Sequence, residues 1–394
     1  MMRLPVFIAA LALLIGLSGC DGVLTTSQEA VGQTGLLLVV ADSATWNGPV
    51  GDAIRSELGK GLRTLPQPEP ALTLQRQELT EAFFSQIQRQ HSVLFVGPYN
   101  RPSSTGRFLR ARLDDAGVAA LERGARGIFY RPDLWAKNQM VVYATAPSDE
   151  ALAAQIRENA DEMRRAFDNV NRRRLTRDMF SRARQTDVED RLMERHGFAV
   201  AVQHDYVVVR DTTFQTATGN AGTFVRMRRI ADSDSWRDMF VYYEDDPRLA
   251  RLHPDSVLAV RNRLSRQFVR GSDDTTYIRI QDRFPERRPI VTDTVNFNDR
   301  FALETRGTWY LADEEGRAAG MGGPFVNYAF YDEDSGRFYL IDGMVFAPRY
   351  DKREFLRQME AIAYTFRTRG DEPAVIADRL EDDLPADPPP SPRR

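Results

Sequence analysis

The chain has 394 residues, of which 42% are hydrophobic and 28% are charged, with 53 basic and 56 acidic side chains. These values are typical of globular proteins and exclude a collagen-like chain, a wholly disordered chain and a membrane protein with many spans. The formal net charge of −3 argues against a nucleic-acid partner, which would require a basic excess on some domain. The length predicts two domains, each with its own core.

The N-terminus carries a predicted secretion and lipidation signal. Arg3 is followed by an apolar run over residues 4–17, and these 14 residues are too few for a membrane-spanning helix of about 20. The run ends in Leu17-Ser18-Gly19-Cys20, which is similar to a bacterial lipobox. We therefore predict a signal peptide over residues 1–19 and acylation of Cys20, with an ordinary signal peptide and a chance cysteine as the alternative.

This signal predicts a localisation in the cell envelope, with the body outside the cytoplasm and anchored to a membrane through acyl chains such as palmitate on Cys20. The choice between inner and outer membrane stays open, because the meaning of Asp21 differs between bacterial groups. Cys20 is the only cysteine, so an internal disulfide is excluded. Residues 20–34 are small and polar and predict a tether reaching at most about 45 Å.

Residues 35–147 predict an N-terminal α/β layer domain, because short apolar runs alternate with amphipathic segments. Buried strands are predicted over residues 36–40, 93–96 and 140–143, with a further strand over 107–113. Helices are predicted over residues 49–58, 83–90 and 116–122. The prolines of segment 66–70 exclude a helix there.

A long helical connector is predicted over residues 148–196. Ser148 is a typical N-cap, and an apolar stripe follows at helical spacing. The stripe consists of Leu152, Ile156, Ala160, Met163, Phe167 and Val170. We interpret Arg172-Arg173-Arg174 as a solvated face, with an anionic headgroup or partner contact as the alternative. Thr186 and Glu189 have the spacing of a capping box, which predicts a second helix ending at Gly197.

Residues 197–370 predict a C-terminal α+β domain, a mainly antiparallel sheet with helices packed on it. Strands are predicted over residues 198–202, 206–209, 223–230, 239–243, 277–280, 301–311, 325–331 and 338–346. Helices are predicted over residues 254–268 and 351–366. The proline-rich acidic tail over residues 371–394 is predicted to be disordered.

No motif for catalysis, metal binding or cofactor binding is present, so we predict no catalytic residue, no metal and no cofactor. The sequence contains neither G-x-S-x-G nor S-x-x-K, and no Walker A or G-x-G-x-x-G motif. The four histidines have no zinc-site spacing. Asp332 begins an acidic segment like a calcium loop, but position 343 is Gly where an EF-hand requires Glu, so a hairpin turn is favoured.

One candidate ligand or partner surface is singled out around Arg306, Trp309, Gly322 and Gly323. Glycines before Pro324 indicate either a tight turn or a close approach of the backbone to a ligand. Arginine and tryptophan supply anchoring contacts beside such a backbone, although a tryptophan is more often a core residue.

Several segments together resemble a known family. They are Trp46 with PQPEP at 66–70, WAKNQ at 135–139, ETRGTW at 304–309, GGPFVNY at 322–328, GMVFAP at 343–348 and KREFLRQMEAI at 352–362. In combination, over about residues 35–367, they are similar to DUF4837, a family of bacterial lipoproteins of unknown function. The resemblance implies an envelope lipoprotein and supplies no catalytic or ligand residues. The last helix resembles small PsbP/Mog1-like domains, which bears on the fold alone.

We therefore expect a membrane-anchored envelope lipoprotein that binds a protein partner or an envelope polymer and is not an enzyme. One alternative is a carboxylate-dependent hydrolase or transferase acting on an envelope substrate, which requires two convergent acids in a pocket, one with a raised pKa. The other is a structural subunit of an envelope assembly that docks through the apolar stripe of the connector, which requires that stripe to be exposed.

Overall fold

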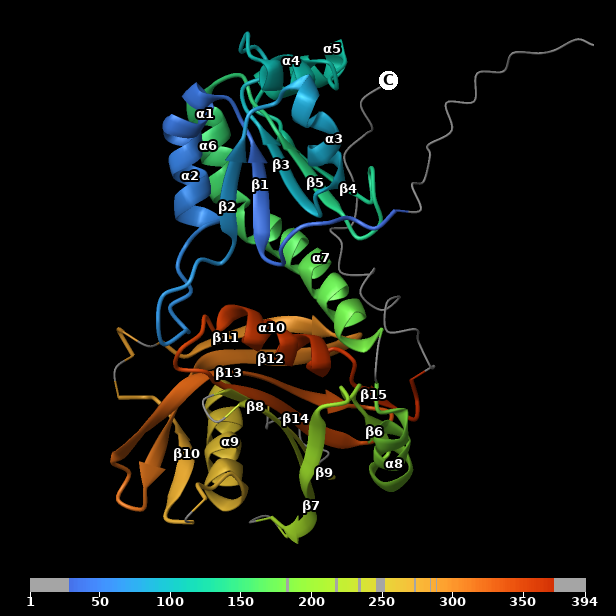
Figure 1. Ribbon diagram of the computed structural model, residues 1–394, viewed down its shortest axis with the longest axis vertical. Coiled ribbons are helices and arrows are strands. Elements are labelled where there is room, and N and C mark those ends of the chain that lie inside the picture. The colour runs from blue at the N-terminus through green and yellow to red at the C-terminus, as the bar shows by residue number, and fades with distance from the viewer. Residues whose placement is uncertain are drawn as a thin grey trace, which may run out of the picture.

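The structure is a computed structural model that describes residues 28–371, apart from residues 182–183, 217–218, 233–234, 246–251, 273, 284 and 288. Two layered domains are joined by the long helix α7 (Ala160–Phe180), as Figure 1 shows. The predicted α+β class is confirmed. The predicted signal peptide, Cys20 and the predicted tail beyond Asp371 lie outside the described residues. Within the described part of the chain, no helix combines the length and apolar character needed to cross a membrane.

The N-terminal domain is a doubly wound sheet with strand order β2-β1-β3-β5-β4. Its strands are β1 (Leu36–Val40), β2 (Thr73–Gln77), β3 (Ser92–Val96), β4 (Ile128–Pro132) and β5 (Met140–Ala144). Only β4 runs antiparallel to its neighbour. The apolar runs predicted as strands are β1, β3 and β5, which are buried on both faces as parallel strands require.

Helices cover both faces of this sheet. They are α1 (Ser43–Asn47), α2 (Pro49–Glu57), α3 (Glu81–Arg89), α4 (Ser104–Arg110), α5 (Asp115–Glu122) and α6 (Asp149–Glu158). The strand predicted over residues 107–113 is wrong, because Ser103 caps a helix there and its Oγ accepts the Gly106 N–H at 3.0 Å. The sequence analysis also missed β2 and β4, where polar residues or a proline break the apolar pattern.

The predicted connector consists of three helices, α6, α7 and α8 (Thr186–His196). Ser148 caps α6 as predicted, since its Oγ accepts the Ala151 N–H at 3.2 Å. The predicted capping box on α8 is wrong: Glu189 is 1% exposed and instead accepts the Val202 N–H at 3.1 Å. The solvated arginine face is also wrong for Arg173 and Arg174, which are each 7% exposed where α7 passes from one domain to the other.

The C-terminal domain is a curved antiparallel sheet with strand order β10-β12-β13-β14-β9-β8-β7, and β11 pairs with β12. The strands are β7 (Tyr206–Gln215), β8 (Ala221–Asp232), β9 (Ser235–Asp245), β10 (Thr276–Ile280), β11 (Val291–Phe297), β12 (Arg300–Asp313), β13 (Ala318–Asp332) and β14 (Arg337–Phe346). β6 (Phe198–Ala199) and β15 (Arg367–Thr368) form a separate two-stranded sheet. The predicted hairpin turn after Asp332 is confirmed between β13 and β14.

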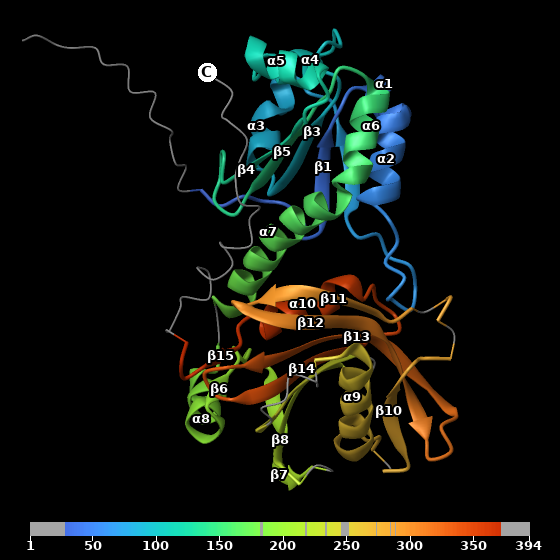
Figure 2. The same ribbon diagram turned by 180° about the vertical axis from the view of Figure 1, so that it is seen from behind.

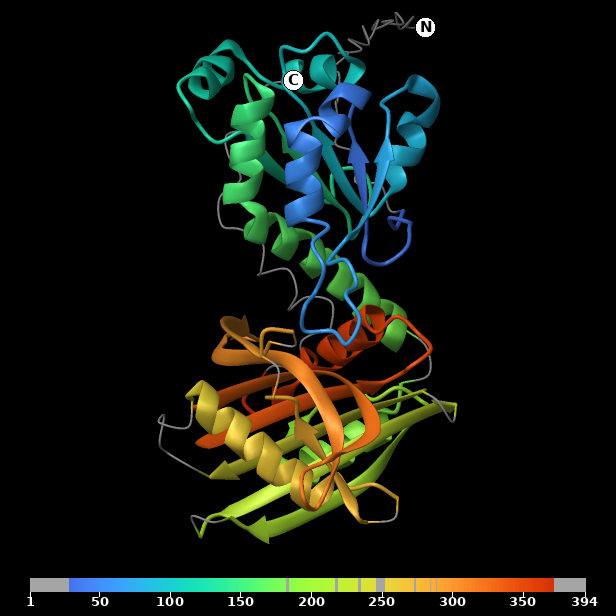
Figure 3. The same ribbon diagram turned by 90° about the vertical axis from the view of Figure 1, so that its left-hand side faces the viewer.

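Two apolar clusters flank the curved sheet because side chains alternate between its faces. Helix α9 (Pro254–Phe268) lies across one face of the sheet, as Figure 3 illustrates. Trp309 and Phe325 belong to the same apolar cluster as this helix. Helix α10 (Arg353–Ala363) packs on the other face, and α8 contributes to the same cluster. Because α10 faces the N-terminal domain, this second face of the sheet forms the boundary between the domains.

Residues 58–72, here named the interdomain loop, connect α2 to β2 and reach into the C-terminal domain. Leu65 is 3% exposed and belongs to the apolar cluster beneath α10. The Glu69 carboxylate accepts the Lys352 N–H at 2.7 Å and the Arg353 N–H at 2.8 Å. These are free N–H groups at the start of α10, so a residue of one domain caps a helix of the other.

The first described residues also pack on the N-terminal domain, although the sequence analysis assigns them to the tether. The Ala30 N–H donates to the Lys137 carbonyl at 3.0 Å, and the Val31 N–H donates to the Arg89 carbonyl at 2.7 Å. Ala30 is buried. Residues 28–31 therefore pack as part of the N-terminal domain, because they pair with it in the manner of short strands.

Candidate functional site

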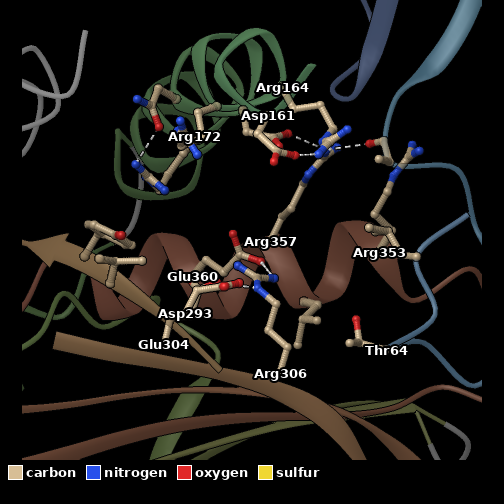
Figure 4. Close-up of a pocket in the computed structure, with 18 of the residues that line it drawn as sticks. Thr64, Asp161, Arg164, Arg172, Asp293, Glu304, Arg306, Arg353, Arg357 and Glu360 are labelled. Atoms are coloured by element: carbon tan, nitrogen blue, oxygen red, sulfur yellow. Dashed lines mark hydrogen bonds and ion pairs between the residues drawn. The ribbon is translucent and has the colours of Figure 1, made fainter. Parts of the chain in front are cut away.

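A cavity of about 720 Å³ lies between the two domains. One wall is α7 with the interdomain loop, and the opposite side is formed by α10, β11 and β12, as Figure 4 shows. This volume is in the range of sites for small molecules, and domain interfaces are common places for such sites.

Charged side chains dominate the lining of this cavity. Seven cationic residues contribute, namely Lys60, Arg164, Arg165, Arg172, Arg306, Arg353 and Arg357. Five acidic residues contribute, namely Asp161, Asp168, Asp293, Glu304 and Glu360. The cavity thus has a cationic excess in a chain whose formal net charge is −3.

Arg306 lies between two carboxylates at the base of the cavity (Figure 4). Its Nε donates to Glu304 at 2.6 Å, and its Nη1 donates to Glu360 at 2.6 Å. Burial raises the pKa of Glu304, but the charge and hydrogen bond of Arg306 outweigh burial and hold this pKa below the ordinary value of 4.5. Glu304 is therefore ionised at neutral pH and is a poor proton donor.

Arg353 and Arg357 connect the wall of α10 to the N-terminal domain. Arg357 pairs with Asp168 of α7 at 2.7 Å and donates to the Ala71 carbonyl at 3.0 Å. Arg353 donates to the Thr73 hydroxyl at 3.2 Å. Together with the cap from Glu69, these contacts hold the two domains in one arrangement, so the cavity is preformed.

The N-terminal wall of the cavity brings like charges together. Burial and the nearby Arg164 lower the pKa of Lys60. Burial also lowers the pKa of Arg164, which pairs with Asp161 and donates to the Glu57 carbonyl at 2.7 Å. Lys60 and Arg165 are exposed, and in the described part of the chain neither has a hydrogen-bonded acid. These two side chains are available to an incoming anion.

Family models divide the chain at nearly the same place as the fold. Residues 185–365 match the model described as domain of unknown function DUF4837. Over these residues the chain is similar to the DUF4837 family. Residues 30–180 match a second model, domain of unknown function DUF8532. No curated protein matches the chain.

The resemblance predicted from the sequence is thus confirmed for the DUF4837 domain. Two of the segments that carried it, residues 66–70 and 135–139, lie instead within the DUF8532 domain. The weaker resemblance to PsbP/Mog1-like domains finds no support in these matches.

The structure separates the four residues predicted as a candidate surface, because only Arg306 lines the cavity. Residues 306 and 309 of β12 fall on opposite faces of the DUF4837 sheet. Trp309 is 1% exposed, stacks on Trp236 at 5.3 Å between ring centroids and lies in the cluster beneath α9. A Cβ on Gly323 would lie 1.9 Å from the Val345 carbonyl oxygen, so this glycine allows close strand packing.

The sequence analysis missed most residues of the cavity, including Lys60, Arg164 and Glu360. A signal was present, because the segments 66–70 and 352–362 stood out and meet through Glu69 and Arg353. Their contact depends on tertiary structure, which no spacing along the chain reports. In the described part of the chain, no three His, Cys, Asp or Glu side chains converge as metal ligands would.

Proposed function

We propose that this chain is a membrane-anchored lipoprotein of the bacterial envelope that binds an anionic ligand in the cavity between its domains. The observation that carries the ligand proposal is the cationic excess of the cavity in an acidic chain. A cleft with a net charge of one sign concentrates ligands of the other sign. The lipobox-like segment before Cys20, the only cysteine, supports the anchor.

The ligand carries a carboxylate or phosphate group toward Lys60 and Arg165. Both side chains are exposed at the N-terminal wall, so binding an anion does not require them to break an existing ion pair within the described residues. At the opposite wall, Arg306 and Arg357 are neutralised by Glu304, Glu360 and Asp168, which leaves them to shape the cavity. Anion selectivity therefore comes from the wall of α7 and the interdomain loop.

The two other hypotheses fit the structure less well. The hydrolase hypothesis requires a cavity acid with a raised pKa, whereas Arg306 bridges Glu304 and Glu360 and the pKa of Glu304 is lowered. The structural-subunit hypothesis requires an exposed stripe on the connector, whereas Met163 and Phe167 are both fully buried.

The ligand proposal is tested with the full chain extracted from membranes in detergent. Inorganic phosphate, succinate and glucose 6-phosphate are titrated by calorimetry at low and high salt. We expect saturable binding that weakens with salt, and at least about tenfold weaker binding in the Lys60→Met/Arg165→Met variant, because each lost contact involves a charge. Arg123 is an exposed cation at the C-terminus of α5, so Arg123→Met is the matched control. Failure of all three probes to bind, or equal binding by the double variant, contradicts the ligand proposal.

The anchor is tested separately by mass spectrometry of the mature N-terminus and by fractionation of cells expressing Cys20→Ser. We expect an acylated Cys20 in the wild type and loss of the variant from the membrane fraction. An intact leader or an unmodified thiol in the wild type contradicts the anchor.

A further inference from the structure

The position at which the chain leaves the body limits how the protein can sit on a membrane. Residues 28–31 are fixed to the N-terminal domain, where the Lys137 N–H donates to the Gln28 carbonyl at 3.0 Å and the Val31 N–H donates to the Arg89 carbonyl at 2.7 Å. Only the eight residues 20–27 separate these contacts from the end of the predicted leader. Fully extended, they span at most about 29 Å.

The surface around this point, here named the exit face, consists of Gln28, Glu29, Arg89, Lys137 and Arg177. Its acid is neutralised: Glu29 pairs with Arg177 and accepts the Asn138 amide at 3.0 Å. Arg177 also pairs with the neighbouring Asp178 at 3.1 Å. Burial raises the pKa of Glu29, but the hydrogen bonds of Asn138 and Arg177 and the charges of Arg177 and Lys137 more than compensate and lower it, so this carboxylate stays ionised.

Two cations of the exit face remain available. Arg89 and Lys137 are exposed, and within the described residues neither side chain has an acid at salt-bridge distance. Asp133, in the same loop as Lys137, uses one carboxylate oxygen to accept the Gln139 N–H at 3.0 Å. The face thus holds the cations Arg89, Lys137 and Arg177 and the acids Glu29, Asp133 and Asp178, so Arg89 and Lys137 lack a salt bridge on a surface without net positive charge.

From this geometry we infer that the exit face lies against the bilayer, with Arg89 and Lys137 contacting phosphate groups of the phospholipids. The inference rests on the proposed anchor at Cys20. The short tether brings this face, rather than the interdomain loop, close to the lipid, because Figures 1 and 2 show the loop on the opposite side of the N-terminal domain from residues 28–31. Each basic side chain close to the lipid headgroups strengthens the attraction to the bilayer.

The orientation is tested with the lipidated full chain in vesicles of phosphatidylethanolamine and phosphatidylglycerol. Acylation consumes the single native thiol, so an introduced cysteine is a unique labelling site. Gln28→Cys marks the exit face and Gly61→Cys marks the interdomain loop, where a Cβ has ordinary contact with Pro68 at 3.5 Å. A fluorophore is attached to the introduced cysteine, and spin labels on the lipid headgroups quench its emission at close range. We expect several-fold stronger quenching at residue 28 than at residue 61.

The lipid contact is tested with the lipidated full chain labelled at Gln28→Cys. We expect Arg89→Gln and Lys137→Gln each to lower the headgroup quenching at residue 28 by about twofold, because each removes a cation that holds this face on the bilayer. Arg123→Gln and Arg263→Gln, exposed cations elsewhere, are the matched controls and leave the quenching unchanged. Equal effects of all four variants overturn the headgroup contact.

The outcomes separate the inference from the anchor. If the lipidated chain remains on vesicles but quenching is equal at residues 28 and 61, the orientation is overturned and the anchor stays in place. If the wild-type chain carries no lipid and does not bind vesicles, the proposed anchor is overturned, and the orientation with it.

Discussion

The two domains bury different chemistry. The central strands β1, β3 and β5 of the N-terminal domain bury almost only apolar side chains, and the Arg101–Asp42 pair beyond their ends keeps 23% and 19% of its side chains exposed. The C-terminal sheet encloses ion pairs beneath α9. Arg261 and Asp342 are both 0% exposed and 2.5 Å apart, and Arg226 holds Asp238 at 2.7 Å.

This difference determines how each domain is held together. Apolar burial tolerates small changes gradually, since its free energy scales with the buried area. A buried ion pair contributes little net stability, because desolvation offsets the attraction, but loss of one partner leaves an uncompensated charge in the interior. The C-terminal domain should therefore be the more sensitive to removal of a single charge.

The largest expected effect is that of Asp342→Leu. It leaves the Arg261 guanidinium buried without its carboxylate and should lower the free energy of unfolding by about 3–5 kcal/mol. Asp42→Ala, which removes a partly exposed cap of α1, should cost only about 1 kcal/mol. Calorimetric unfolding of the full chain measures both.

The double variant Arg261→Leu/Asp342→Leu is the control for this prediction, because it removes both charges. We expect it to regain most of the lost stability. If the single and double variants are equally unstable, the loss comes from packing rather than from the buried charge, and the contrast between the domains is not electrostatic.

A second prediction compares a glycine in each domain. A Cβ on Gly323 would lie 1.9 Å from the Val345 carbonyl oxygen, and a Cβ on Gly127 would lie 1.9 Å from the Thr145 carbonyl oxygen. Gly323 belongs to β13, which lies between β12 and β14 in the sheet, whereas Gly127 precedes the edge strand β4. We expect Gly323→Ala to cost about 1–3 kcal/mol and Gly127→Ala to cost less, because an edge strand can shift. Thermal unfolding checks the order, and the reverse order contradicts it.

The same contrast decides how much of the fold could be predicted from the sequence. Long regular patterns were sufficient for the helix over residues 254–268 and for strand β1, whose predicted and observed bounds agree. Strands β2 and β11 were missed because they are edge strands with polar, partly exposed side chains. Asp342 and Arg261 gave no sequence signal, because a charge is normally interpreted as a surface position.

The candidate site was predictable only in part. Arg306 was found because it stands beside glycines and a tryptophan, yet its actual partners are Glu304 and Glu360. The remaining lining comes from α7 and the interdomain loop, which approach Arg306 only after both domains fold. Side chains from segments hundreds of residues apart share no local pattern.

The cap between the domains gives a third and smaller effect. Glu69→Gln weakens the acceptor for the Lys352 and Arg353 N–H groups and should cost about 1 kcal/mol, as the loss of a helix cap does. Hydrogen exchange in the first turn of α10 should increase while exchange in β1 is unchanged. Gln67→Ala, an exposed position of the same loop, is the control. Equal exchange in both variants would show that Glu69 does not hold the domains together.

The smallest effect is expected at the cavity, and it depends on pH. Arg306 keeps 27% of its side chain exposed, so solvent screening limits the loss in Arg306→Met to about 1 kcal/mol at neutral pH. The pKa of Glu304 is lowered in the folded protein, so its contribution is present above the ordinary value of 4.5 and is lost as the pH falls through the folded value. The stability difference between wild type and variant should therefore shrink between neutral pH and about pH 3. Arg123→Met should show no such pH dependence. A constant difference for Arg306→Met would mean that this side chain stabilises the fold through packing rather than through its charge.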